Sequence, residues 1–368
     1  MRSLIPIAAL VSSVAAWGAA GHEIVATIAQ ILLTDHTRDQ LCLILPPWSK
    51  CHLAPVAPWA DQIKRFPEWR SWTSAMHYVN PIGDWPSKHC EFGESGWHAP
   101  DRNLLVAITN YTRIVAESSG QDQDYALRFL VHYVGDIHQP LHLTGRERGG
   151  NGIKVRFDRR ISSLHGVWDG GLITKSIREM TNYTHPLPDK RIENALRGTI
   201  YDPYVRFIVK EGLLGWWKNE YPSWSLCPAE PASSPTYARS HASQKFFRAT
   251  NTTGLITPIS DDPDLPVCPY HWAEPLHKLN CEIVFPPELD TPDPNKRSWL
   301  TKASSGLITL ASNPRPEYLE LDTPKYAGYI RDHKILEKLL AQAGVRLAAV
   351  LNDIFDPSTD GAREQLVW

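Results

Sequence analysis

Two histidine–aspartate pairs in this sequence have a spacing that could bind a metal ion: His132 with Asp136, and His165 with Asp169. Side chains four residues apart on a helix project from one face, so each pair can offer an imidazole nitrogen and a carboxylate oxygen to the same ion. His142 follows the first pair closely. Ligands of these types suit zinc. The pattern therefore predicts a zinc site.

A pattern as short as His-x-x-x-Asp also occurs by chance. The chain has 15 histidines, for which about one accidental His-x-x-x-Asp match is expected. His185 and Asp189 form a match of this kind, and we interpret it as incidental because two prolines between them break the helical face. His132 lies in an apolar run, where an unpaired polar group is costly. A core histidine satisfied by a hydrogen bond is its alternative role.

The elements that must position these residues are predicted to be helices. Apolar residues recur with helical spacing over 24–32, 127–137 and 335–354, where a single glycine interrupts the last pattern. Alternation over 153–157 predicts a short strand or hairpin. The segment 227–294 is rich in proline, serine and aspartate, and we expect a long irregular insertion pinned by its cysteines. The predicted fold is mainly α, a single-domain multi-helix bundle with a small β-hairpin.

The first 16 residues predict a cleavable secretory signal. Arg2 precedes an apolar run over 4–11 and then small residues. The run is too short for the roughly 20 residues that cross a bilayer. We therefore expect a secreted chain that starts at Trp17, with no membrane partner, one catalytic domain over 17–356 and a C-terminal tail over 357–368.

Three other features agree with export or restrict the function. Six cysteines, an even number, favour disulfides in an exported chain. The net charge of −2 argues against a basic surface that grips long polyanions, so a metal would have to supply positive charge locally. Acceptor sequons predict glycosylation at Asn110, Asn182 and Asn251.

The order of the motifs resembles that of the zinc-dependent single-strand nucleases of the S1/P1 type and, more distantly, the trinuclear-zinc phospholipases C. The motifs are Trp-Gly-x-x-Gly-His from Trp17, Trp-Ala-Asp at 59–61, the segment around His77, the run 129–142, Gly-Gly-Asn at 149–151 and His-Gly-Val-Trp-Asp at 165–169.

The resemblance implies three zinc ions per chain and a ligand set for each. Because an amine at Trp17 forms only after signal removal, export and activation would be coupled. The implied sets are Asp61, His77, His132 and Asp136 for one ion; His142, His165 and Asp169 for the second; and His22, Asp136 and the α-amino and carbonyl groups of Trp17 for the third.

The resemblance also implies roles around the metals. Asp61 would orient or deprotonate the attacking water, while Lys64 and Asn151 would contact phosphate. Tyr78 would stack on an unpaired base. Asn80 stands where these nucleases often have an aspartate that bonds the base edge, so base preference should not be inherited. A solvated helix face for Lys64, a turn residue for Asn151 and a core position for Tyr78 are the alternatives.

The implied activity is hydrolysis of single-stranded DNA, RNA and 3′-nucleotides to 5′-phosphorylated or dephosphorylated products, with no obligate protein partner. In the family pattern Cys281 pairs with a cysteine near Cys90. The remaining cysteines are then expected to pair with one another. The expected disulfides are Cys42–Cys51, Cys90–Cys281 and Cys227–Cys268.

Two other functions remain as alternatives. A phospholipase C would use nearly the same ligands, but those enzymes tend to have glutamate at Asp169 and lack the combination of Lys64, Asn151 and Tyr78. A secreted zinc-binding glycoprotein without catalysis would be expected to lose a ligand or Lys64, and none is lost here.

Overall fold

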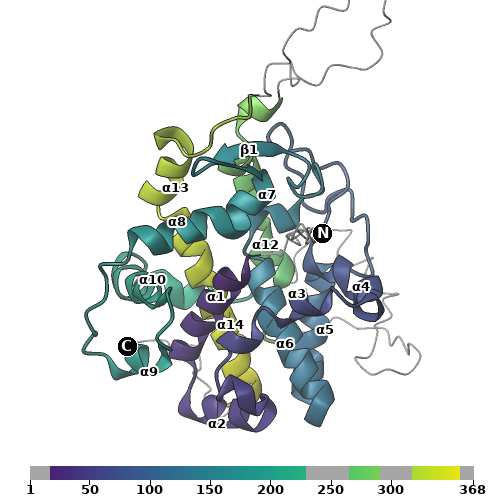
Figure 1. The fold of residues 1–368 in the computed structure, drawn as a ribbon. Helices are drawn as coiled ribbons and strands as arrows, with labels where there is room; N and C mark the ends of the chain where they lie inside the picture. Colours follow the sequence, from purple (N-terminus) through teal and green to yellow (C-terminus); the bar gives the residue numbers. More distant parts are fainter. Residues whose placement is uncertain (1–16, 229–264, 291–316, 357–368) are drawn as a thin grey trace, which may run out of the picture.

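The computed structural model describes residues 17–228, 265–290 and 317–356, and it confirms a mainly helical chain with one small hairpin (Figure 1). The predicted signal and C-terminal tail lie outside these residues. The α-helices are α1 (Ala19–Leu32), α2 (Asp35–Ile44), α3 (Trp59–Ile63), α4 (Pro67–Thr73), α5 (Leu104–Glu117), α6 (Gly120–Asp136), α7 (Leu164–Gly166), α8 (Leu172–Glu179), α9 (Lys190–Ala195), α10 (Asp202–Phe207), α12 (Pro269–Leu279), α13 (Tyr329–Asp332) and α14 (Ile335–Phe355).

Short 3₁₀ and π-helical turns join or extend these helices. They are η1 (Pro47–Ser49), η2 (Ala54–Val56), η3 (Ser74–His77), η4 (Pro140–Leu143), η5 (Val167–Gly171), η6 (Ile208–Trp216), η7 (Tyr221–Ser223), η9 (Asn280–Val284), η10 (Pro287–Asp290) and η11 (Pro324–Gly328).

The centre of the bundle is α14, which packs against α1, α5 and α6 (Figure 1). Gly344 lies where α14 crosses α1, and a Cβ at this position would be only 2.4 Å from Cγ2 of Ile28. The glycine that interrupts the apolar pattern in the sequence therefore does not interrupt the helix. It allows the two backbones to approach closely, at the entropic cost that glycine carries in a helix.

The predicted hairpin is present and leads directly into the second histidine–aspartate pair. Strands β1 (Lys154–Phe157) and β2 (Arg160–Ser163) are antiparallel, with Val155 opposite Ser162. Val155 and Phe157 are buried, while the residues that alternate with them are exposed. The side chain of Ser163 accepts a hydrogen bond from the Gly166 backbone N–H at 3.0 Å and so begins the short helix α7.

The prediction of an irregular segment over 227–294 is wrong for its C-terminal part. Residues 269–284 form α12 and η9, and Trp272 is buried there. Proline at the first helical positions misled the interpretation, because it is compatible with a helix start as well as with a loop. Residues 229–264 and 291–294 of the segment lie outside the described residues.

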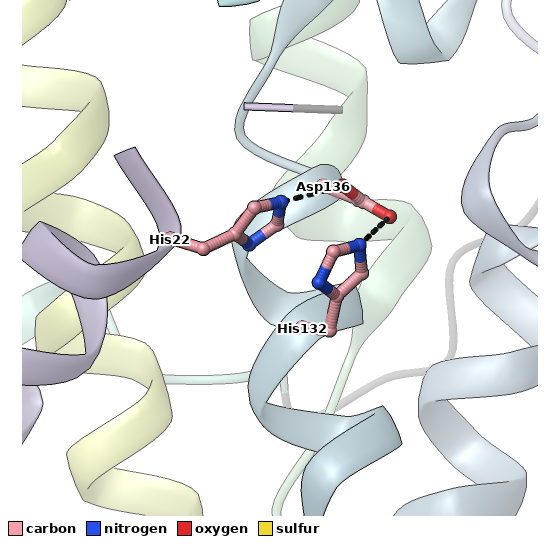
Figure 2. Close-up of side chains that lie close together, drawn as sticks. All are labelled: His22, His132 and Asp136. Carbon is pink, nitrogen blue, oxygen red and sulfur yellow. Dashed lines mark ion pairs between the residues drawn. The ribbon is translucent and has the colours of Figure 1, made fainter. Parts of the chain in front are cut away.

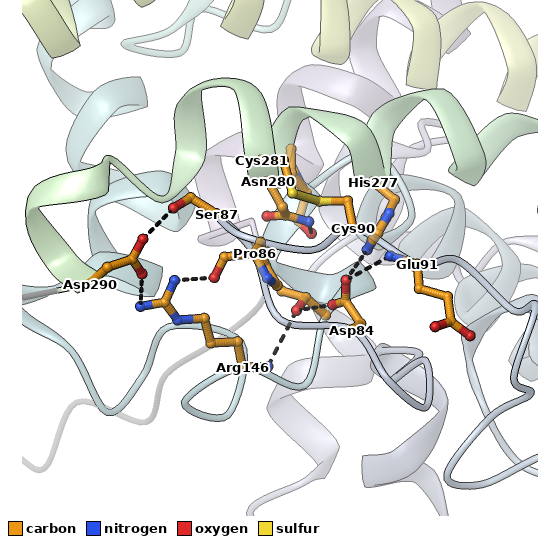
Figure 3. Close-up of a disulfide and its surroundings, with 12 residues drawn as sticks. Asp84, Pro86, Ser87, Cys90, Glu91, Arg146, His277, Asn280, Cys281 and Asp290 are labelled. Atoms are coloured by element: carbon orange, nitrogen blue, oxygen red, sulfur yellow. Dashed lines mark hydrogen bonds and ion pairs between the residues drawn. A yellow bond between two sulfur atoms is a disulfide. The ribbon is translucent and has the colours of Figure 1, made fainter.

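All three expected disulfides are present. Cys90–Cys281 ties the loop after the Tyr78 segment to η9, which directly follows α12, as Figure 3 shows. Cys42–Cys51 closes a short loop, and Cys227–Cys268 joins the two ends of a segment whose interior, 229–264, is not described. These cross-links restrict the unfolded chain.

The helices and the sequon asparagines bear on the expectations about membrane association and glycosylation. Within the described residues, no helix is both long enough and apolar enough to span a bilayer. Asn110 lies on α5 and is only 6% exposed, so the folded chain gives no access to its amide and a glycan there is disfavoured. Asn182 is exposed, and its glycosylation stays a prediction. Asn251 lies outside the described residues.

Candidate metal centre

Asp136 is the centre of the first cluster, and four imidazoles surround its buried carboxylate. Its Oδ1 lies 3.3 Å from His22 Nε2 and 3.8 Å from His142 Nδ1. Its Oδ2 lies 2.9 Å from His77 Nδ1 and 3.3 Å from His132 Nε2. One carboxylate therefore joins side chains from α1, η3, α6 and η4.

The close approach of α1 to α6 depends on a glycine. Figure 2 shows His22 on α1 reaching Asp136, with His132 one turn earlier on α6. A Cβ on Gly135 would lie 2.6 Å from His22 Nδ1, so any larger residue would push the imidazole away. The rings of His22 and His132 stack with their centroids 3.7 Å apart.

Asp61, His77 and His132 form a second possible ligand group. It shares His132 with the group of His22, His132 and Asp136. Asp61 Oδ1 lies 3.6 Å from both His77 Nδ1 and His132 Nε2. Asp61 comes from the short helix α3, and Lys64, three residues later, places its ammonium 2.6 Å from Asp61 Oδ1. The predicted ligands of the first ion therefore lie together.

His142, His165 and Asp169 form the other cluster. His165 Nε2 lies 3.0 Å from Asp169 Oδ2, and the rings of His142 and His165 are 5.1 Å apart. Gln139 donates from Nε2 to Asp169 Oδ1 at 2.6 Å and accepts the Leu141 backbone N–H through Oε1 at 2.7 Å. The Gln139 amide thus holds the carboxylate in place, a role that the motif alone did not reveal.

Backbone carbonyls orient three of the histidines. In each case Nδ1–H donates to a carbonyl, which leaves Nε2 for a metal ion, the usual outer-shell arrangement. The pairs are His132 with Ala57 O at 2.7 Å, His142 with His77 O at 2.6 Å and His165 with Gly149 O at 2.6 Å.

The electrostatics of the buried groups keep the carboxylates ionised. Burial alone would lower the pKa of His132, but Asp136 and Asp61 outweigh it and raise that pKa to about 10. Burial would raise the pKa of Asp136, yet the imidazoles, His132 foremost, hold it well below its usual range. Burial and the neighbouring His132 lower the pKa of His22. Several buried carboxylates so close together require compensating cations.

The geometry fits zinc. Two atoms bound to one tetrahedral zinc at about 2.0–2.2 Å lie roughly 3.3–3.6 Å apart, and the spacings between His132 Nε2 and the two carboxylates are 3.3 and 3.6 Å. Buried polar atoms without a hydrogen-bond partner also gather here, as expected of atoms that face an ion. They include His77 Nε2 and His142 Nε2. His132 Nε2, Asp61 Oδ1, Asp136 Oδ1 and Asp169 Oδ2 have groups of the opposite charge type as close neighbours.

Trp17 is buried beside this centre. It precedes Gly18, whose backbone N–H donates to Asp169 O at 2.7 Å, so the start of the described chain is held against the second cluster. His22 follows one turn into α1. The third ligand set, with the amine and carbonyl of Trp17, stays a prediction.

A cleft of about 580 Å³ opens on the metal-facing histidines, and the predicted substrate residues line it. Lys64, Tyr78, Asn80 and Asn151 are all part of its wall. Tyr78 is 41% exposed, which excludes the core alternative. Asn151 donates one hydrogen of Nδ2 to Arg148 O at 2.8 Å, so its second hydrogen can still serve a ligand.

Asp84, Cys90 and His277 also lie close enough together to hold an ion, but their bonding indicates a structural role. Cys90 is in a disulfide, so it offers no thiolate. Asp84 Oδ1 lies 2.9 Å from His277 Nε2 (Figure 3). Its Oδ2 accepts a hydrogen bond from the hydroxyl of Thr144. The carboxylate thereby joins α12 to the loop after η4.

The pair that the sequence interpretation set aside is indeed apart from both clusters. His185 is exposed, and Asp189 caps α9 by accepting the Arg191 backbone N–H at 2.8 Å. The spacing was accidental, and the aspartate serves the helix start.

Comparisons with known proteins agree over most of the chain. The S1/P1 Nuclease family model matches residues 17–356. Endonuclease 4 of Arabidopsis thaliana is 31% identical over 356 residues, which cover 94% of this chain and 91% of that protein. Endonuclease 3 of the same plant is 35% identical over 242 residues, covering 63% and 74%. Nuclease S1 of Aspergillus oryzae is 38% identical over 180 residues, covering 46% and 60%. The family match includes both clusters.

Proposed function

The chain belongs to the S1/P1 nuclease family, and we propose that it is a secreted zinc-dependent endonuclease that cleaves single-stranded DNA and RNA to 5′-phosphorylated products. We infer that it also removes the phosphate of 3′-nucleotides. The observation that carries the proposal is the opening of both histidine–aspartate clusters onto one cleft, whose wall holds an exposed aromatic ring and the Lys64 ammonium.

The residues of both clusters would hold three zinc ions in the sets given above. Bound zinc lowers the pKa of a coordinated water and neutralises charge on phosphoryl oxygens. The buried carboxylates of Asp136 and Asp169 and the partly buried carboxylate of Asp61 would balance the charge of the ions. The backbone carbonyls behind the histidines would fix the ring orientations.

Asp61 and Lys64 would act on the reacting groups. Burial would raise the pKa of the Asp61 carboxyl, but His132 foremost, and then Lys64 and His77, hold it low, so the carboxylate is ready to accept a hydrogen bond from the attacking water. The Lys64 ammonium lies at the cleft wall, where it can donate to a phosphoryl oxygen as negative charge develops. Asn151, in the loop before β1, would be a second donor to the phosphate.

Single-strand selectivity would come from Tyr78. Its exposed ring offers a flat surface for a base, and a base inside a duplex reaches such a surface only after it is unstacked and unpaired. Within the cleft, Asn80 can both donate to and accept from a base edge.

Secretion is supported by the three disulfides and by the family match, which starts at residue 17. Processing at that residue would free the Trp17 amine, which the resemblance gives as a ligand of the third zinc ion together with His22 and Asp136. A chain that keeps residues 1–16 should then bind two zinc ions rather than three.

The test is hydrolysis of single-stranded against double-stranded DNA by a chain that starts at Trp17, with zinc counted by mass spectrometry on the same sample. Three zinc ions, strong preference for the single strand and 5′-phosphate ends are expected, and Asp61→Asn should abolish most of the activity. Three zinc ions with hydrolysis of phosphatidylcholine vesicles and none of DNA would contradict the proposal and favour a phospholipase C.

A further inference from the structure

The cleft beside the metal centre contains a positive charge that none of the described residues neutralises. Lys64 and Arg148 both line the cleft, and its lining includes no aspartate or glutamate. The Lys64 ammonium is already paired with Asp61 at 2.6 Å. Arg148 is exposed, and within the described parts of the chain its guanidinium makes no hydrogen bond or ion pair. The Arg148 guanidinium is therefore the positive charge in this cleft that can pair with a ligand.

Arg146, two residues earlier in the same loop, has a structural role and provides a comparison for Arg148. It is buried, and its guanidinium donates to Pro86 O, lies 2.9 Å from Asp290 Oδ1 and stands 4.8 Å above the Phe285 ring (Figure 3). These contacts fasten the loop to η10 and to the loop around residue 86. With the loop fastened by Arg146, Arg148 is left for another role.

The backbone holds Arg148 at the cleft in an unusual conformation. Four consecutive residues have positive φ: Glu147 at 49°, Arg148 at 58°, Gly149 at 62° and Gly150 at 76°. A non-glycine residue in this region is strained, and it persists where its surroundings enforce it, often at functional sites. Here Arg148 O accepts from Asn151 Nδ2 at 2.8 Å, and Glu147 O accepts from the backbone N–H at 152 at 2.9 Å.

We propose that Arg148 binds a phosphate of single-stranded nucleic acid that neighbours the phosphate being cut. This inference rests on the proposed function and adds a specificity determinant to it. Lys64 and Asn151 serve the reacting phosphate, and Arg148, three residues before Asn151 on the same loop, is a further donor in the lining of this cleft. A guanidinium suits phosphate because it can donate two parallel hydrogen bonds. Arg148 would therefore favour polymers over mononucleotides.

The experiment compares Arg148→Gln with Arg159→Gln in the chain that starts at Trp17. Arg159 is a matched control, because it is also exposed with a positive φ, 62°, but lies in the β1–β2 turn and is not part of the cleft lining. The substrates are a 3′-mononucleotide and a single-stranded pentanucleotide with one preferred cleavage site. In further pentanucleotides, each phosphate that neighbours that site is replaced in turn by a neutral methylphosphonate.

Arg148→Gln should lower the ratio of kcat/KM for the pentanucleotide to kcat/KM for the mononucleotide about tenfold, and Arg159→Gln should leave this ratio within about twofold. One methylphosphonate should reduce cleavage about tenfold in the unmodified protein but hardly at all in Arg148→Gln, because both changes remove the same contact. The proposal would be overturned if Arg148→Gln lowered kcat/KM equally for the pentanucleotide and the mononucleotide. It would also be overturned if every methylphosphonate had the same effect in Arg148→Gln as in the unmodified protein.

Equilibrium binding separates this inference from the proposed function. Fluorescence anisotropy with a labelled all-methylphosphonate strand and its phosphodiester counterpart reports on phosphate contacts without any need for cleavage. Arg148→Gln should weaken binding of the phosphodiester strand and reduce the slope of log affinity against log salt by about 0.7. An unmodified protein that cleaves neither substrate would refute the proposed function alone, whereas unchanged binding and an unchanged slope would refute the role of Arg148.

Discussion

His22 on α1 and Asp136 at the end of α6 meet with Nε2 and Oδ1 3.3 Å apart, although more than a hundred residues separate them in the chain. The contact places the first helix of the described chain against the carboxylate that three other histidines also approach. The metal centre is therefore assembled by the packing of α1 on α6.

Gly135→Ala should remove one zinc ion from this centre. The added Cβ would lie 2.6 Å from His22 Nδ1, so the imidazole has to move away from Asp136. We expect two zinc ions per chain instead of three by mass spectrometry, and nuclease activity at least about tenfold lower. Gly170→Ala is the matched control, since it also neighbours a ligand but nothing lies within 4 Å of its added Cβ. Three ions in Gly135→Ala would show that His22 is not required.

Gln139→Met should weaken zinc binding at the second cluster. The amide holds Asp169 Oδ1 at 2.6 Å, and methionine fills a similar volume without a donor. We expect about 10–100-fold weaker affinity for one ion, the usual cost of losing such an outer partner. Competition with a zinc chelator measures the affinity of each protein for zinc. Gln139→Glu keeps the bond to the Leu141 N–H but should weaken zinc further, because a second carboxylate would face Asp169. Equal affinity in all three proteins would contradict this role.

Arg146→Met should destabilise the fold far more than Arg148→Gln. Removal of the buried guanidinium leaves Asp290 and the Pro86 carbonyl without their partner, and we expect a loss of about 2–4 kcal/mol in the free energy of unfolding. Arg148 has no such partners, so its replacement should cost less than about 0.5 kcal/mol. Urea denaturation with zinc present compares them, and similar losses would argue against the division of roles.

His52 should make the fold sensitive to mild acid. Burial lowers the pKa of His52 from 6.5 to about 4, while Nδ1 accepts the Ala54 N–H at 3.0 Å and Nε2 lies 2.9 Å from Ala195 O. The unfolded chain therefore binds the proton more readily, so stability is highest above pH 6.5 and falls as the pH drops towards 4, by about 3 kcal/mol from this group.

The check on His52 is urea denaturation between pH 7 and pH 4.5. His52→Gln should be less stable than the unmodified protein at pH 7 and should lose less on acidification, because glutamine does not titrate. His185→Gln, at an exposed position, should follow the unmodified protein. Parallel curves for His52→Gln and the unmodified protein would disprove the assignment.

The local part of the site was readable from the sequence because helical periodicity is a local property. His132 and Asp136 share a face of α6 wherever that helix lies, and the alternation over 153–157 predicted the hairpin that precedes His165. The motif order added the grouping of the ligands and the disulfides. Prediction failed for residues 269–284, where proline-rich composition obscured a helix that buries Trp272.

Tertiary structure alone decided which polar groups face the metal centre. His132 and His138 stand in one apolar run, yet His138 donates to Val134 O and accepts from Arg346 on α14, whereas His132 Nε2 faces Asp61 and Asp136. Residue types and their spacing by themselves indicated a mainly helical chain with histidine–aspartate clusters that could hold metal ions. Which carbonyl orients each imidazole, and that Arg146 is buried while Arg148 faces the cleft, depends on contacts between distant segments, which local sequence does not encode.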